Sequence, residues 1–226
     1  MAVTELAILK LRPAALTADN KPNESTISFC RDAKKSMEIF TGLPFHILTQ
    51  VDDPSFIYIV GSWESLSQHY DEWIPSEANQ KLLERSKDTF DIAGLAHLDL
   101  DQKEFGIPFD APMLALGWFY MRPERKEAFT KAWEENVPFL KEFTAPYTVR
   151  SGWRVDNDKM IEGRKVVDKD AAAEGEAEVE EFVAFTGWRD VSHNDSFAQS
   201  EGFSQHQQLV SHLTNVEMKR LVKLDL

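Results

Sequence analysis

His206 is the residue of this chain best suited to acid–base chemistry. Together with Phe203, Val210 and Leu213 it falls at helical spacing on one apolar stripe. An inward-facing imidazole of this kind can take up or release a proton near neutral pH, or orient a substrate carbonyl. The same position is also compatible with a histidine that is simply packed in the core or half exposed.

Two further histidines are second candidates for the same role. His193 lies near the predicted start of the same helical region, where a neutral imidazole is favoured and helix capping is the alternative interpretation. His69, which Tyr70 follows, begins a helical segment in the first half of the chain. For His69 the alternative is a plain surface position at a helix end.

Aromatic side chains on predicted strands could form a slot for a planar ligand. Indole N–H groups and a tyrosine hydroxyl would fix the orientation of that ligand, although aromatic residues on strands are also ordinary core residues. Arg122, before a proline at a strand end, could pair with a ligand carboxylate or be solvated. The candidates for substrate binding are Trp188, Trp118, Tyr120, Trp153, Phe203 and Arg122.

The spacing of the remaining reactive residues favours a site without metal or cofactor. The six histidines, at positions 46, 69, 97, 193, 206 and 212, form no HxH or HExxH pattern. The sequence also has no glycine-rich phosphate loop and no GxSxG elbow. Cys30 lies on an apolar helical stripe and is expected in the core.

The candidates sit on a pattern that occurs twice in the chain. In FIYIVGSWESLSQHYDEWIPSE (Phe56–Glu77) and in FVAFTGWRDVSHNDSFAQSEGFSQH (Phe182–His206), an apolar run ends in tryptophan, a Ser or Asp turn follows, and Ser-Glu comes later. LAILKL and LGWFYM, each closed by Arg-Pro, begin 110 positions apart at Leu6 and Leu116. The sequence therefore predicts one unit written twice.

Each predicted unit has the order strand, helix, strand, strand, helix, strand. Helical stripes at 27–40 and 129–140 follow the first strands, and Pro138 is expected to bend or end the second of these helices. Leu-Asp-Leu at 98–100 and 224–226 is expected to end the fourth strand of each unit. This order is typical of a ferredoxin-like α+β fold, a βαββαβ repeat. Because such an antiparallel sheet has helices on one face, two copies can cover each other's free faces as an intramolecular α/β barrel.

The repeat gives the domain boundaries. We expect a first ferredoxin-like barrel repeat at residues 1–100, a linker at 101–112 and a second repeat at 113–226. The second repeat carries an acidic insertion at about 156–181, whose residues 168–181 include seven acids and one lysine. Such a segment is typical of a solvated loop.

Composition excludes several classes of partner. The formal net charge is −13 and the pI is about 4.9, so phosphate backbones and anionic membrane surfaces are repelled. No nucleic acid and no membrane partner is expected. A single cysteine suits a reducing compartment, and Glu5 and Lys10 interrupt the N-terminal apolar run, so a cytoplasmic location is expected.

Trp188 followed by SEGFSQH (Ser200–His206) resembles the tryptophan and Ser-x-x-Phe-x-x-His of the dimeric α/β-barrel superfamily. That superfamily includes the antibiotic biosynthesis monooxygenases, with their ABM domain, and the stress-responsive barrel proteins. The resemblance covers nearly the whole chain as a tandem fusion. It implies a pocket between each sheet and its helices, and a cofactor-independent monooxygenase or polyketide cyclase of secondary metabolism that acts on an aromatic or polyketide-like substrate.

The chain departs from the family pattern at two places. Leu82 stands where the second repeat has His206, so a histidine-dependent site is expected once per chain. Haem-degrading relatives use an asparagine on the first strand, and neither LAILKL nor LGWFYM contains one, which makes haem chemistry the less favoured activity. A non-enzymatic barrel that binds a ligand or a protein stays open as the alternative, as does pairing of the pseudo-dimeric chain into a homodimer.

Overall fold

The computed structural model describes residues 1–103, 106–157 and 179–226. The chain divides into two compact units. Unit 1 holds the described residues 1–103, 155–157 and 221–226, and unit 2 holds 106–154 and 179–220. Most of the predicted acidic insertion, and residues 104–105 of the predicted linker, lie outside the described residues. Two stretches of the second predicted repeat, residues 155–157 in its middle and 221–226 at its end, group with unit 1.

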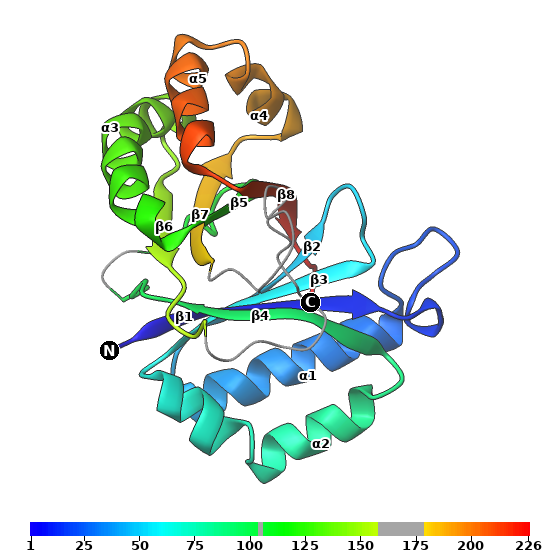
Figure 1. Cartoon of the computed structure of the whole chain (residues 1–226). Coiled ribbons are helices and arrows are strands. Elements are labelled where there is room, and N and C mark those ends of the chain that lie inside the picture. Colours follow the sequence, from blue (N-terminus) through cyan, green and yellow to red (C-terminus); the bar gives the residue numbers. More distant parts are fainter. Residues whose placement is uncertain (104–105, 158–178) are drawn as a thin grey trace, which may run out of the picture. The chain divides into compact units, whose positions relative to one another are not determined.

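Unit 1 is an antiparallel sheet with helices on one face (Figure 1). Its strands hydrogen-bond in the order β4-β1-β3-β2, and the last residues of β8, Leu221–Lys223, pair with β2. In chain order the elements are β1 (Val3–Leu11), η1 (Pro13–Ala15), α1 (Glu24–Thr41), β2 (Phe45–Gln50), β3 (Phe56–Trp63), the π-helix η2 (Gln68–Trp73), α2 (Glu77–Ser86) and β4 (Phe90–Leu98).

Unit 2 repeats this plan with its helices again on one sheet face (Figure 1). The strand order is β8-β5-β7-β6. The elements are β5 (Met113–Met121), η3 (Pro123–Arg125), α3 (Lys126–Thr144), β6 (Val149–Trp153), β7 (Glu180–Trp188), α4 (Val191–Phe197), α5 (Glu201–His206), η4 (Gln207–His212) and β8 (Asn215–Lys223).

The predicted fold class is confirmed: the chain is α+β, and its described residues form eight antiparallel strands in two ferredoxin-like units. Two details differ from the expectation. Pro138 does not end its helix, since α3 continues to Thr144. The final Leu-Asp-Leu lies just beyond β8, and Leu224 continues the hydrogen bonding by donating its backbone N–H to the Ile47 carbonyl at 2.9 Å. The duplication itself stays a prediction.

Side-chain caps start helices α2, α4 and α5. Asp190 accepts from the His193 amide at 2.7 Å, Ser76 from the Asn79 amide at 3.1 Å, and Ser200 from the Phe203 amide at 3.2 Å. Each cap satisfies an amide that has no partner within its helix. The matched Ser-Glu positions therefore begin helices in both units.

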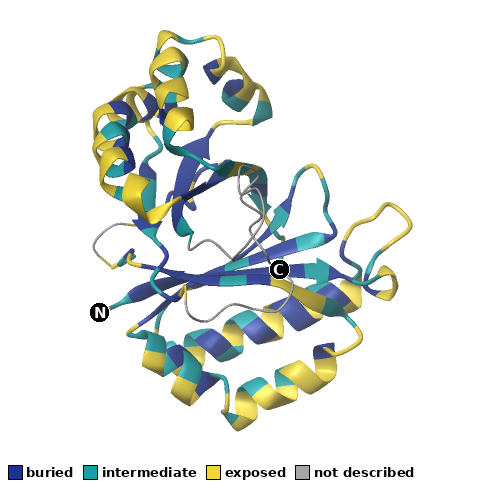
Figure 2. Ribbon diagram, in the orientation of Figure 1, coloured by how far each residue is buried: buried dark blue, intermediate teal, exposed yellow. Residues whose placement is uncertain are grey.

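The helix-facing side of the unit 1 sheet is filled with apolar side chains. In Figure 2 the inner stripe of α1 is buried and its outer stripe is exposed. Phe45, Trp63 and Phe29 are among the largest buried residues of this layer. Cys30 lies here too, and its burial raises the pKa of its thiol to about 12. No helix in the described ranges has the length and apolar character of a membrane span.

Gly61 on β3 is required by the packing of this core. A Cβ at Gly61 would overlap the ring of Phe45, its direct partner on β2. We expect Gly61→Ala to lower the free energy of unfolding by about 1–3 kcal/mol, because the ring must leave its position. Gly106→Ala is the control, since no heavy atom lies within 4 Å of its added Cβ and a change below about 0.5 kcal/mol follows. Urea unfolding of both variants tests this, and equal stabilities would contradict the packing described.

Candidate functional site

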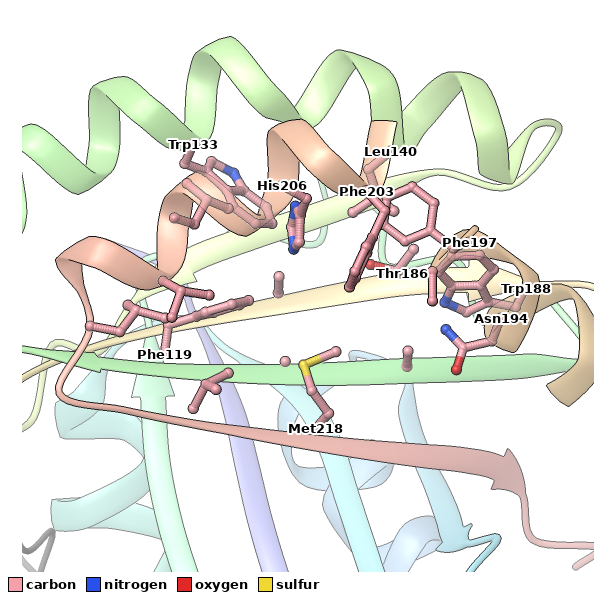
Figure 3. A pocket seen from close by; sticks show the side chains of 18 of the residues that line it. Phe119, Trp133, Leu140, Thr186, Trp188, Asn194, Phe197, Phe203, His206 and Met218 are labelled. Atoms are coloured by element: carbon pink, nitrogen blue, oxygen red, sulfur yellow. The ribbon is translucent and has the colours of Figure 1, made fainter. Parts of the chain in front are cut away.

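Unit 2 contains a cavity of about 370 Å³ between its sheet and its helices (Figure 3). Small-molecule sites commonly have volumes of about 300–1,000 Å³. The lining is mainly apolar, with a few polar side chains. It consists of Ala115, Gly117, Phe119, Trp133, Leu140, Ala184, Thr186, Trp188, Asn194, Asp195, Phe197, Ala198, Phe203, His206, Leu209, Val210, Leu213, Val216 and Met218.

Small residues on the strands leave the space for this cavity. Successive side chains of a strand point to opposite faces, so Ala115, Gly117 and Phe119 of β5 share the face that the helices cover. Ala184 continues the same floor on β7. Because Ala115, Gly117 and Ala184 are small, no large side chain at these strand positions fills the space below the helices, and a cavity remains.

The opposite wall comes from the helices. Trp133 and Leu140 extend from α3, Phe197 from α4, and Phe203 and His206 from α5. Figure 3 shows the His206 ring projecting from α5 toward the strands, beside Trp133.

His206 is half-buried among aromatic rings. Its ring meets those of Trp133 and Phe197 edge-on, with centroids 6.0 and 5.9 Å away. Burial lowers the pKa of its imidazole below the usual value of about 6.5, so the ring is neutral at neutral pH. Its Nδ1 is buried and has no hydrogen-bond partner among the described residues. A neutral imidazole in such surroundings can act as a base.

Trp188 brings a second polar atom to the cavity. The residue is 2% exposed, and within the described ranges its indole Nε1 has no hydrogen-bond partner. In unit 1, Trp63 occupies the same structural position, because Val3 pairs with Trp63 as Met113 pairs with Trp188.

The residue that faces these two indoles differs between the units. Two positions after Val3 stands Glu5, and two positions after Met113 stands Ala115. Glu5 accepts a hydrogen bond from the Trp63 indole, whereas the methyl group of Ala115 cannot. Unit 2 therefore has both a buried donor and free volume at the place where unit 1 has a carboxylate.

Trp118 and Tyr120 occupy the alternate positions of β5, and neither is among the residues that line the cavity. Trp118 Nε1 donates to a Glu181 carboxylate oxygen at 2.6 Å, and the Tyr120 hydroxyl donates to Glu217 at 2.7 Å. Glu181 is also paired with Arg154 at 2.6 Å. Both aromatic side chains thus donate hydrogen bonds to carboxylates of unit 2.

The remaining predicted residues also lie away from the cavity lining. Trp153 packs against Phe182, and the Lys126 ammonium lies 4.5 Å from its ring centroid. Arg122 is exposed at the start of η3. Their role in substrate binding stays a prediction.

The two second-choice histidines lie in different surroundings. His193 is 8% exposed and is not part of the cavity lining. Its ring stacks on Phe143, with centroids 5.1 Å apart, and meets the Trp188 ring edge-on at 5.3 Å, so it packs against the indole. His69 belongs to unit 1, where it lies beside Glu5. Of the predicted residues, the structure brings Trp188, Phe203 and His206 together around the cavity.

Thr186, Asn194 and the small residues of the floor were missed by the sequence analysis. When the two halves are aligned at the offset of 110, Glu5 corresponds to Ala115. This replacement of an acid by a small residue is a feature of the sequence that indicates extra space in the second half. Asn194 and Thr186 carry no comparable signal, because short polar residues are common at such positions.

The chain matches no protein-family model and no curated protein sequence. Solved structures do resemble it. An anthrone oxidase-like protein has a TM-score of 0.65 at 10% identity, covering 99% of this chain and 92% of its own. A candidate monooxygenase from Fusobacterium nucleatum subsp. nucleatum has 0.60 at 11%, covering 99% and 93%. A variant of the chlorite dismutase from Candidatus Nitrospira defluvii has 0.53 at 12%, covering 99% and 91%.

What these proteins share with the chain is the fold. Their likeness agrees with the predicted ferredoxin-like barrel type over nearly the whole sequence. At these identities it does not extend to the residues of the cavity.

The burial of His206 predicts a pH dependence of stability. Its pKa is lowered in the folded state, so below about pH 6.5 the unfolded chain binds more protons at this residue than the folded chain. The free energy of unfolding therefore falls as the pH falls from about 6.5 toward the folded pKa. We expect His206→Phe, which cannot take up a proton, to lose less stability than the wild type between about pH 7.5 and 5.5 in urea unfolding. The same loss in both proteins would show that His206 does not resist protonation.

Proposed function

We propose that the cavity of unit 2 binds a planar, largely aromatic compound and that the chain oxidises this compound with molecular oxygen. The observation that carries the proposal is the pair of buried polar atoms in an otherwise apolar lining. Among the described residues that line the cavity, Trp188 and His206 are the two that hold a buried nitrogen without a hydrogen-bond partner.

The indole and the imidazole suit different parts of such a ligand. Trp188 Nε1 is a donor only, so it favours a ligand oxygen such as a carbonyl or a phenolate. A buried donor without a partner costs about 1–3 kcal/mol, and a ligand that accepts from it recovers this energy. The rings of Phe119, Trp133 and Phe197 offer flat apolar contacts to an aromatic body.

The proposed chemistry uses His206 as the base. An aromatic ketone with an acidic methylene group gives up one proton to the neutral imidazole, and the resulting carbanion is stabilised by its rings and by the Trp188 N–H at the oxygen. The carbanion reduces O₂, and the peroxide anion that forms takes the proton back from His206 to give a hydroperoxide. His206 then removes the second proton from the same carbon and passes it to the departing hydroxide. Water leaves and a second carbonyl remains.

This sequence of steps is balanced. The methylene carbon exchanges two C–H bonds for one C=O bond, one atom of O₂ enters the product and the other leaves as water. O₂ is thus the oxidant, and no further reductant is required. Because the substrate supplies the electrons, the residues of the cavity need only position it, hold the proton and exclude water.

The structural likeness supports this class of reaction. One neighbour is named as an anthrone oxidase-like protein and another as a candidate monooxygenase. The same carbanion could instead attack a carbonyl of its own chain, which would make the reaction a polyketide-type cyclisation. We further propose that the protein acts in the cytoplasm and in secondary metabolism.

His206→Gln tests the chemical step. With an anthrone as substrate, we expect O₂ consumption per enzyme to fall about 100- to 10,000-fold, since the general base is lost, while binding of the anthrone persists. His212→Gln is the matched control, because His212 lies in the next helix and is not part of the lining, and it should retain the wild-type rate. Anthrone binding without O₂ consumption by the wild type would indicate a binding protein in place of an enzyme.

Ala115→Glu tests the binding site. The variant restores in unit 2 the acid that faces the indole in unit 1, so its carboxylate should accept from Trp188 and fill the floor of the cavity. We expect loss of anthrone binding in fluorescence titrations, with a cooperative thermal unfolding transition retained. Ala78→Glu, on an exposed position of α2, serves as the control and should bind as the wild type does. Unchanged binding by Ala115→Glu would rule out this cavity as the site.

A further inference from the structure

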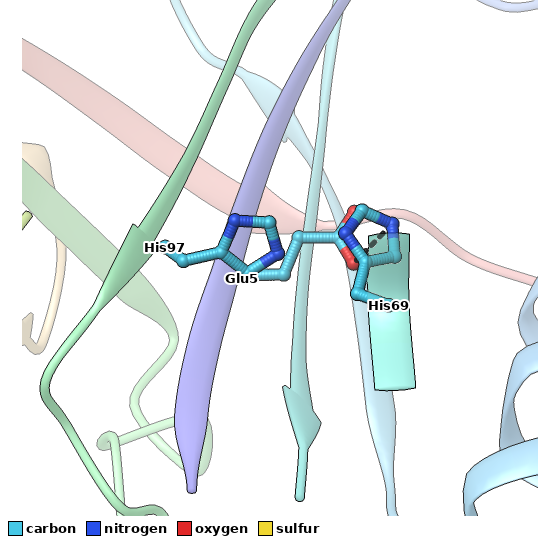
Figure 4. Close-up of side chains that lie close together, drawn as sticks. All are labelled: Glu5, His69 and His97. Atoms are coloured by element: carbon cyan, nitrogen blue, oxygen red, sulfur yellow. Dashed lines mark ion pairs between the residues drawn. The ribbon is translucent and has the colours of Figure 1, made fainter. Parts of the chain in front are cut away.

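A second cluster of buried polar side chains lies within unit 1. Glu5 on β1, His69 on η2 and His97 on β4 are 5%, 5% and 0% exposed. One possible ligand atom from each of the three lies within 4.8 Å of the other two. Figure 4 shows the three side chains converging, with the Glu5 carboxylate beside the His69 ring.

The sheet register and an unusual helix bring these groups together. Glu5 and His97 are direct cross-strand partners, so their side chains share one face of the sheet about 5 Å apart. His69 comes from the π-helix η2, and its ring lies 4.7 Å from that of His97. π-helical turns are rare and occur frequently at functional sites.

Asp156 fixes the orientation of His97. One oxygen of its carboxylate accepts from the His97 backbone amide at 3.1 Å, and the other lies 2.8 Å from His97 Nδ1. The Tyr70 hydroxyl donates to the same second oxygen at 2.8 Å. An ionised carboxylate can only accept, so Nδ1 carries the proton and Nε2 keeps its lone pair. This Nε2 is buried and has no hydrogen-bond partner in the part of the chain that the structure describes.

The buried carboxylate of Glu5 also favours the binding of a cation in this cluster. Glu5 is held by the Trp63 indole, and His69 Nε2 lies 3.7 Å away, but no lysine or arginine of the described residues forms an ion pair with it. A buried carboxylate without a balancing charge is costly. A divalent ion would balance the charge of Glu5 directly.

We propose that Glu5, His69 and His97 bind a divalent first-row transition-metal ion, with Asp156 as the residue that positions His97. Two imidazoles and one carboxylate are common ligands of Zn²⁺. The second ring nitrogen of a metal-bound histidine commonly donates a hydrogen bond to a carboxylate, and Asp156 is placed to accept such a bond from His97. Bonds of about 2.0–2.2 Å in a tetrahedral geometry place ligand atoms about 3.4 Å apart, so small side-chain rotations from the present positions suffice. The site lies in unit 1, and the oxidation proposed for unit 2 does not use it.

Metal titration of the full chain tests the proposal. After dialysis against a chelator, calorimetric titration with Zn²⁺ should show one strong site per chain, and Co²⁺ should give the visible absorption of a tetrahedral complex. NMR should show the imidazole resonances of His69 and His97 shifting on Zn²⁺ addition while those of His46 stay unchanged. This readout uses the wild type and therefore decides the question even where a variant fails to fold.

Variants of the ligands test the assignment. Glu5→Gln keeps an acceptor for the Trp63 indole but should abolish stoichiometric Zn²⁺ binding, and Asp156→Asn should weaken binding about 10- to 100-fold. His46→Gln, a half-buried histidine of β2 outside the cluster, is the control and should bind as the wild type does. Absence of a stoichiometric site in the wild type, or full binding by Glu5→Gln, would overturn the proposal.

Discussion

In each unit, the kind of site that forms depends on which group lies opposite the indole N–H of one buried tryptophan. Trp63 and Trp188 end equivalent strands and are almost fully buried, so each indole places a hydrogen-bond donor inside the protein. In unit 1 the donor meets Glu5. In unit 2 the corresponding residue is Ala115, and the donor meets the cavity. The difference between Glu5 in unit 1 and Ala115 in unit 2 thus distinguishes a position filled by a carboxylate from a position with room for a ligand.

The surroundings of each cluster then determine its chemistry. In unit 2, aromatic rings lie around His206 and its burial lowers the pKa of the imidazole, which keeps the ring neutral as the proposed role of base requires. In unit 1, Leu82, the sequence counterpart of His206, packs against the apolar core. There the histidines lie beside carboxylates, and such pairing favours a bound cation over a bound aromatic molecule. The same fold therefore offers two different kinds of site.

Much of the fold could be predicted from the sequence because its signals are local. The ends of β1 and β5 before Arg-Pro and the inward stripe with His206 each depend on a few neighbouring residues. The side of a strand that helices cover is not local. Trp118 and Tyr120 share β5 with Phe119, and all three are buried, so burial alone cannot tell which face of the strand meets the cavity.

The cluster in unit 1 could not be predicted from spacing, because its members come from three elements far apart in the chain. Glu5 is visible in the sequence as an acid within an apolar run, but the run gives no sign of the residues that Glu5 meets. The sequence offers His69 as a candidate catalytic residue, and in the structure the centroid of its ring lies 4.5 Å from that of Trp63 and 4.7 Å from that of His97. The pairing of Glu5 with His97 follows from the register of β1 against β4, two strands that lie far apart in the chain.

The most direct test of this account is the indole N–H resonance of Trp188, compared with that of Trp63, during titration with 1-tetralone, an aromatic ketone. The Trp188 signal should shift progressively as the carbonyl oxygen accepts its hydrogen bond, while the Trp63 signal, held by Glu5, stays in place. If the ketone binds and the Trp188 signal does not move, the indole is not the group that receives the ligand.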